Sequence, residues 1–362
     1  MVDIFAPLTF TSSRNYSLTG PERGRAFADG LVNADWYETP VDRKAIKELM
    51  KRRNGPALRD CAIWFGLLIL TGAGGVYFWG SWWALPFFAV YGVLYGTLSD
   101  SRWHESLHGT PFKTDWMNDW LYNLASFMQI WNPVIWRWSH MRHHTDTTIV
   151  GRDPEIGTMR PPQLILMALN IVGLTSVPRN LLALARHAIG HFTADERDFT
   201  PADELPKAAW VARIHLAIHA SVWLSFVHFG TILPLMLIGL PRAYGVWLLL
   251  IIGLSQHAGL AEDVLDHRLN SRTIYLPLPL RFIYWNMNYH VEHHMFMMVP
   301  YYNLPRLHEL IKHDCPRAKG LWETWAEMLP VMIRQVRDHN HYIHQQLPEG
   351  AGAANIGPRT VH

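Results

Sequence analysis

A tract of 39 residues, at positions 61–99, contains no Asp, Glu, Lys or Arg. As a single helix it would extend roughly 58 Å, because each helical residue adds about 1.5 Å. The hydrocarbon core of a bilayer is only about 30 Å thick, so the tract is long enough to cross it twice. Gly80, followed closely by two tryptophans, provides a turn signal near its middle. The tract therefore predicts a helical hairpin in a membrane, with arms at 61–79 and 83–99.

A second apolar tract of 48 residues, at 214–261, contains Arg242 as its one charged residue. Its length also predicts two crossings, with a break between Gly230 and Tyr244, where the segment GLPRAYG carries the strongest breaker signal. The stretch 163–178 is apolar but has only 16 residues. It is too short for an ordinary span and predicts an interfacial or re-entrant helix.

The composition agrees with a membrane protein. Charged residues make up 17% of the chain, against about 25% in typical soluble domains, and there are 17 tryptophans, which favour membrane interfaces. The net charge of +2 gives no reason to expect nucleic acid as a partner. Two distant cysteines exclude a disulfide scaffold. Six Lys and Arg residues within 43–53 precede the first hairpin, so the N-terminal segment should be cytoplasmic.

Three histidine clusters occur on the polar sides of these tracts, with the sequences HESLH, HMRHH and HVEHH. They contribute His104, His108, His140, His143, His144, His290, His293 and His294. Residues three and four positions apart lie on one face of a helix, so each cluster can direct its imidazoles at one place. Imidazole suits iron, copper and zinc, and eight ligands exceed what one zinc can use. The clusters predict a site for two metal ions, with copper or two zincs left open by spacing alone.

Two other classes of protein share parts of this pattern. HESLH taken alone has the form of a zinc-peptidase motif, in which Glu105 would be the general base. That reading leaves HMRHH and HVEHH unexplained. A metal-storage or sensor protein would be a non-catalytic alternative.

The predicted fold class is all-α and integral to the membrane. Four transmembrane helices in two hairpins would carry a cytoplasmic helical cap that holds the histidine-rich di-metal site. The expected segments are a cytoplasmic N-terminal segment (1–60), hairpin one (61–99), a cytoplasmic region with the first two clusters (100–213), hairpin two (214–261), a cytoplasmic region with the third cluster (262–344) and a flexible tail (345–362).

From about residue 60 to 310 the chain resembles the membrane fatty acid desaturase family, whose integral-membrane di-iron enzymes carry three histidine boxes. The resemblance lies in HESLH, in WRWSHMRHHTDT followed by DPE, and in NMNYHVEHHMFMMVPYYNLPRLHEL. The order of the boxes and the hydrophobic tracts between them agree with the family pattern. Met298 departs from it, since lipid desaturases often have proline there.

The resemblance implies two iron ions and a dioxygen-dependent desaturase acting on a fatty acyl or other lipid-like substrate. A hydroxylase or demethylating oxygenase acting on a small molecule uses the same scaffold. The family commonly adds a histidine after the last span, and His257 holds that place, with His267 as a nearby competitor. No HPGG haem-domain motif occurs, so a separate ferredoxin- or rubredoxin-like carrier with its reductase is the expected electron donor.

Acidic residues near metal-binding histidines commonly accept a hydrogen bond from the imidazole and so orient it. The candidates are Glu105, Asp146, Asp153, Glu262, Asp263 and Glu292. Two further histidines, His215 and His219, lie inside the second apolar tract at helical spacing. We expect these two to serve packing or a transport pathway rather than metal binding.

Overall fold

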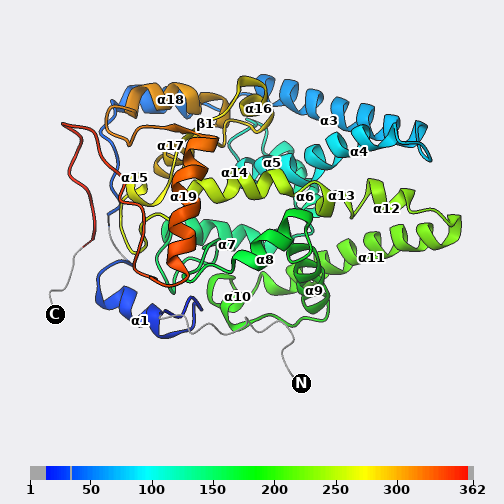
Figure 1. Cartoon of the computed structure of the whole chain (residues 1–362), viewed down its shortest axis with the longest axis horizontal. Coiled ribbons are helices and arrows are strands. Elements are labelled where there is room, and N and C mark those ends of the chain that lie inside the picture. The colour runs from blue at the N-terminus through cyan, green and yellow to red at the C-terminus, as the bar shows by residue number, and fades with distance from the viewer. Residues whose placement is uncertain (1–13, 33–34, 358–362) are drawn as a thin grey trace.

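The computed structural model describes residues 14–32 and 35–357, and it is mostly helical. Figure 1 shows two pairs of helices, α3 with α4 and α11 with α12, that extend from one end of a larger helical body. A short parallel pairing joins β1 (Ile274–Tyr275) to β2 (Lys319–Gly320), with Ile274 opposite Lys319. The prediction of a mainly helical chain is confirmed.

The first apolar tract forms a helical hairpin, but its second arm is divided where the sequence predicts one helix over 83–99. Helix α3 (Asn54–Tyr77) packs along α4 (Ala84–Gly92), and the turn between them contains Gly80 at φ +87°. Gly74 is required for this close packing, because a Cβ atom there would overlap the ring of Phe87. After α4 the chain continues through a π-helical segment, η1 (Val93–Thr97), into α5 (Leu98–Leu107). The helix that leaves the hairpin therefore leads directly into the first histidine cluster.

The second apolar tract differs from the prediction. Helix α11 (Leu205–Phe229) is long, but the returning arm is divided into α12 (Leu233–Leu237), α13 (Pro241–Tyr244) and α14 (Trp247–His257). Proline removes a backbone donor and glycine loosens the helix, so the sequence LPLMLIGLPRAYG cannot form one continuous helix. The 11 residues of α14 extend about 16 Å, roughly half of the hydrocarbon core.

The expected count of four transmembrane helices is therefore not clearly met. Within the described part of the chain, two helices, α3 and α11, are long and apolar enough to cross a membrane. A third candidate consists of two consecutive parts: α8 (Leu164–Leu169) with η2 (Asn170–Val172), and then α9 (Ser176–Ala188). The two parts meet at an angle of 86°, so they add a crossing only if they count as one span. This bent pair covers the stretch for which the sequence predicts an interfacial or re-entrant helix.

The remaining helices build the body that carries the histidine clusters. They are α1 (Pro21–Ala28), α2 (Arg43–Leu49), α6 (Asp115–Met128), α7 (Pro133–Thr145), α10 (Ala194–Phe199), α15 (His267–Asn270), α16 (Leu278–Ile283), α17 (His290–Met295), η3 (Tyr301–Asn303), α18 (Leu304–Ile311) and α19 (Leu321–Gln335). The presence of this body on the cytoplasmic side, and the division into six segments, stay predictions.

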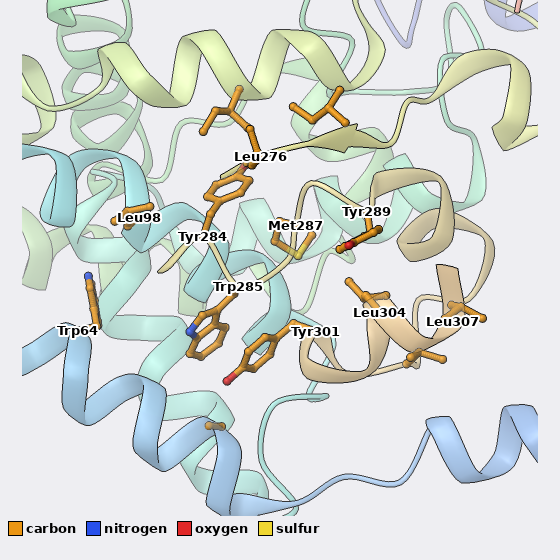
Figure 2. Packing of buried hydrophobic residues seen from close by; sticks show 14 of the residues in the cluster. Trp64, Leu98, Leu276, Tyr284, Trp285, Met287, Tyr289, Tyr301, Leu304 and Leu307 are labelled. Atoms are coloured by element: carbon orange, nitrogen blue, oxygen red, sulfur yellow. The ribbon is translucent and has the colours of Figure 1, made fainter. Parts of the chain in front are cut away.

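The largest buried cluster joins the first hairpin to the third histidine cluster. Figure 2 shows Trp285 beside Tyr301, and their rings stack at 4.2 Å between centroids. The guanidinium of Arg102 lies 5.0 Å from the Trp64 ring centroid and 4.8 Å from that of Trp285. Arg102 is 1% exposed and donates to the Leu98 carbonyl, so its charge is held by aromatic faces and backbone oxygen. This contact fixes α5 against the segment that precedes α17.

The C-terminal segment follows an irregular path along the body. Gly352 N donates to Asp314 Oδ1 at 2.7 Å, and Asn355 N donates to Asp266 Oδ2 at 3.2 Å. Residues 358–362, the end of the predicted flexible tail, lie outside the described residues. Flexibility of this tail stays a prediction.

Candidate metal centre

Four helices direct the histidines of the sequence prediction toward one region of the body. His104 and His108 lie at the end of α5, while α7 and α17 carry three histidines each at positions i, i+3 and i+4. The last residue of α14 is His257. All nine side chains gather into two adjacent groups.

We call the first set the five-histidine group. It consists of His104, His108, His140, His144 and His293, whose ligand nitrogens all lie within 4.8 Å of one another. The Nε2 atoms of His104 and His293 are 2.7 Å apart, and those of His140 and His144 are 3.1 Å apart. Two nitrogens bound at about 2.1 Å to one ion, at a right angle, would be about 3.0 Å apart. The spacing therefore fits nitrogen ligands that share one metal ion.

The four-histidine group consists of His143, His257, His290 and His294. Its Nε2 atoms show the same short spacing, with 2.8 Å from His257 to His290 and 3.0 Å from His290 to His294. Helices α7 and α17 contribute to both groups, because neighbouring residues on a helix point in different directions. The two groups are in direct contact, with the rings of His144 and His294 stacked at 4.5 Å.

The structure distinguishes His257 from its competitor. His257 belongs to the four-histidine group, and its Nδ1 lies 2.9 Å from the carbonyl oxygen of Asn270. His267 is outside both groups, and its ring stacks on Trp36 at 4.3 Å with an interplanar angle of 4°. The backbone carbonyl fixes the proton of His257 on Nδ1 and leaves Nε2 free to bind a metal.

Burial keeps His293 in the form that binds metals, because burial and the neighbouring His143 lower its pKa to about 3. At His143 the Asp153 carboxylate outweighs burial, and the pKa is raised. A neutral imidazole has a nitrogen lone pair to offer, whereas an imidazolium has none. Nε2 of His108 is also buried without a hydrogen-bond partner, as expected for an atom placed to bind an ion.

Two carboxylates accept hydrogen bonds from Nδ1 of histidines in the second cluster. Asp153 Oδ2 lies 2.9 Å from His143 Nδ1, and Glu155 Oε2 lies 2.9 Å from His140 Nδ1. Burial raises the pKa of Glu155 to about 7. Each acid accepts the Nδ1 proton and turns Nε2 toward its group. Asp153 was among the acids predicted from sequence, and Glu155 was missed, although the DPE segment after the second cluster contains it.

Glu105 contacts a histidine of another cluster. Its carboxylate is fully buried, accepts from Thr110 Oγ1 at 2.9 Å and from Tyr301 N at 3.0 Å, and lies 3.5 Å from His293 Nδ1. Burial raises the pKa of Glu105 to about 8. The residue thus links the first histidine cluster to the third, and the sequence carries no signal of this pairing.

The other four predicted acids have different partners among the described residues. Asp146 pairs with Arg152 at 2.9 Å, Glu262 with Arg14 at 3.0 Å, and Asp263 accepts from Val150 N at 2.9 Å. Glu292 is buried and bonds to His308 and Thr273, neither of which belongs to a histidine group. These acids stabilise the loops around the centre rather than the grouped imidazoles.

Comparison with known proteins agrees with the arrangement of the site. No curated protein matches the sequence. The family model described as fatty acid desaturase matches residues 80–325, which is more than half of the chain and includes all three histidine clusters. Together with the apolar helices, this match identifies a membrane protein of an oxidoreductase family. The chain therefore belongs to the fatty acid desaturase family.

Proposed function

We propose that the protein is a membrane-bound, di-iron, dioxygen-dependent desaturase that acts on a fatty acyl or other lipid-like substrate. The observation that carries this proposal is the gathering of nine histidines into two adjacent groups of five and four. One zinc takes four protein ligands, so a single zinc site cannot use this set. Two iron ions, one in each group, would bind dioxygen and supply the oxidising power that an unactivated C–H bond requires.

The protein's own residues would prepare and hold this centre. Buried imidazoles would present Nε2 to the ions, while Asp153 and Glu155 fix the opposite nitrogen of His143 and His140. Glu105 lies 3.5 Å from Nδ1 of His293, close enough for an electrostatic contact with that imidazole. The hydrogen bonds from Asp153 and Glu155 would keep their two imidazoles in the same orientation when the ions change charge.

The reaction needs an external source of electrons. Forming an alkene removes two hydrogens from the substrate, and reducing dioxygen to two waters requires two further electrons and two protons. We propose that a separate ferredoxin- or rubredoxin-like carrier with its reductase supplies the electrons. The basic cluster within 43–53 supports placing the body, and therefore this carrier, on the cytoplasmic side.

A second candidate function is a hydroxylase or demethylating oxygenase acting on a small molecule. The observation in its favour is an open cavity of about 310 Å³ that reaches His144 of one group and His294 of the other. Binding sites for small molecules have volumes from about 300 Å³ upward, so the cavity is at the small end of that range.

The zinc-peptidase reading of HESLH finds no support in the site. Its general base would have to face a metal-bound water and the substrate. Glu105 is instead fully buried and accepts hydrogen bonds from Thr110 and Tyr301. His104 and His108 also share their group with histidines of the other two clusters.

The proposal is tested by comparing bacteria that express the wild-type protein with bacteria that express His293→Ala. Lipid and metabolite profiles, measured by mass spectrometry, should contain an unsaturated or hydroxylated product that is absent with the variant. A loss of two mass units identifies desaturation, and a gain of sixteen identifies hydroxylation. Equal product formation by a correctly inserted His293→Ala protein would contradict the site assignment.

A further inference from the structure

The open cavity at the two histidine groups is built from segments far apart in the sequence. It is lined by His144 and His294, one from each group, which we call the histidine floor, and by the segment 295–299 that follows the third cluster. Residues 36–38, with Met50 and His267, complete the lining. A substrate in this cavity would therefore contact both histidine groups at once.

The wall formed by residues 36–38 is firmly attached to the body. Trp36 Nε1 donates to the carbonyl of Thr145 at 3.0 Å, directly beside His144 in the chain. Tyr37 OH donates to Asp314 Oδ2 at 2.8 Å, and the guanidinium of Arg268 lies 3.4 Å from the Tyr37 ring centroid. These contacts give the cavity a defined shape, so its volume and chemistry can select a ligand.

Apart from its histidines and the segment 36–38, the lining is apolar. Met50, Met295, Met297, Met298 and Phe296 contribute flexible or aromatic surface, which adapts to irregular apolar shapes. Among the described residues that line the cavity there is no lysine, arginine, serine, threonine, asparagine or glutamine. The one carboxylate is Glu38, which is exposed and therefore marks the side open to solvent.

We propose that this cavity binds a compact substrate that is neutral or carries a single positive charge, with its reacting carbon at the histidine floor and its polar end at Glu38. The inference rests on the proposed oxidising role of the histidine groups and, for the substrate, favours the second candidate, an oxygenase that acts on a small molecule. A volume of about 310 Å³ lies at the small end of the range for small-molecule sites, about 300–1,000 Å³.

The charge of the polar end follows from what faces it. An anionic end placed at the opening would meet the Glu38 carboxylate, with no cationic side chain in the lining to offset the repulsion. An amine would be attracted at the same position. Because Glu38 is exposed, the preference should be modest, about two- to fivefold in affinity.

The test uses the iron-loaded, full-length protein in nanodiscs and three probes with the same skeleton: hexan-1-amine, hexan-1-ol and hexanoate. Binding is measured by isothermal titration calorimetry against empty nanodiscs. We expect hexan-1-amine to bind most tightly and hexanoate most weakly. Glu38→Gln should remove the preference for the amine, and the matched surface variant Glu309→Gln should keep it.

A second variant tests the location. Met298→Trp should weaken binding of all three probes at least tenfold while its iron content equals that of the wild-type protein. Tighter binding of hexanoate than of hexan-1-amine, or unchanged binding to Met298→Trp, would overturn the inference. A wild-type protein without iron would instead contradict the proposed function, so the two failures can be told apart.

Discussion

Two pairs of buried histidines have the same helical spacing and entirely different surroundings. His140 and His144 on α7 have their Nε2 atoms 3.1 Å apart, and Glu155 Oε2 lies 2.9 Å from Nδ1 of His140. His215 and His219 on α11 also lie four residues apart and are 6% and 8% exposed, yet both pack against the ring of Phe127. The stacked ring of His219 is 4.8 Å from it.

The difference shows what a histidine needs in order to become a metal ligand in this protein. Spacing places two imidazoles on one face of a helix, and both pairs satisfy that condition. In the first pair, other helices add further nitrogens, and an acid fixes the proton on Nδ1. The second pair belongs to neither group, and its neighbour is an aromatic ring that cannot accept a strong hydrogen bond.

The largest effect should come from removing one ligand of either group. His104→Ala and His290→Ala should each lose one of the two proposed irons, because an ion left with fewer imidazoles dissociates more readily. Both should also abolish dioxygen uptake that depends on reductant. Iron is measured by mass spectrometry of the purified protein, with His215→Ala as the control that keeps its full content.

A smaller loss of iron affinity is expected when the residue that orients a ligand histidine is removed. Glu155→Ala leaves His140 in place but removes the acceptor that orients it. Loss of such a partner typically weakens metal binding by about 10- to 100-fold. Competition with a chelator of known iron affinity measures the change. An exposed acid, Glu323, serves as the control, and an equal effect of Glu323→Ala would mean that the change in affinity is not specific to the site.

The gathering of the histidines could be predicted from the sequence more directly than the number of membrane spans. Eight of the histidines stand at spacings that place them on one face of a helix, and the family resemblance adds His257; the structure gathers all nine. The count of four spans assumed a single break in each apolar tract, whereas the prolines and glycines of 233–245 divide the last arm into several short helices. Whether a proline or glycine ends a helix depends on whether the backbone groups freed there can form hydrogen bonds elsewhere, and tertiary packing decides this.

Contacts between distant segments were also beyond the sequence. Glu105 contacts a histidine 188 positions later, and the pairing of Asp153 with His143 and of Glu155 with His140 depends on how one loop folds back. His257 is favoured over His267 because α14 ends at the centre, whereas Trp36 covers His267. None of these pairings follows from a local pattern.

Packing between the hairpins and the body should affect stability rather than metal affinity. A Cβ atom on Gly245 would overlap the carbonyl group of Gly92, where the two apolar tracts meet. Gly245→Ala should therefore destabilise the protein by about 1–3 kcal/mol, seen as a lower midpoint of thermal unfolding in detergent. Gly66 in α3 has open space around it, so Gly66→Ala should leave the midpoint unchanged or raise it slightly.

The smallest effect should follow from changing the pair on α11. His219→Leu keeps an apolar contact with Phe127 and removes only the stacking of the two rings, which contributes about 0.5–1.5 kcal/mol. Iron content and dioxygen uptake should stay at wild-type values. If this variant lost iron, the distinction between the two histidine pairs would fail.

The central claim is that the grouped histidines hold two iron ions, and metal content tests it most directly. Mass spectrometry of the detergent-purified protein should find two irons per chain. The double variant His143→Ala/His294→Ala removes two of the four ligands of one group and should lose iron sharply. One zinc per chain, unchanged in the double variant, would contradict the account.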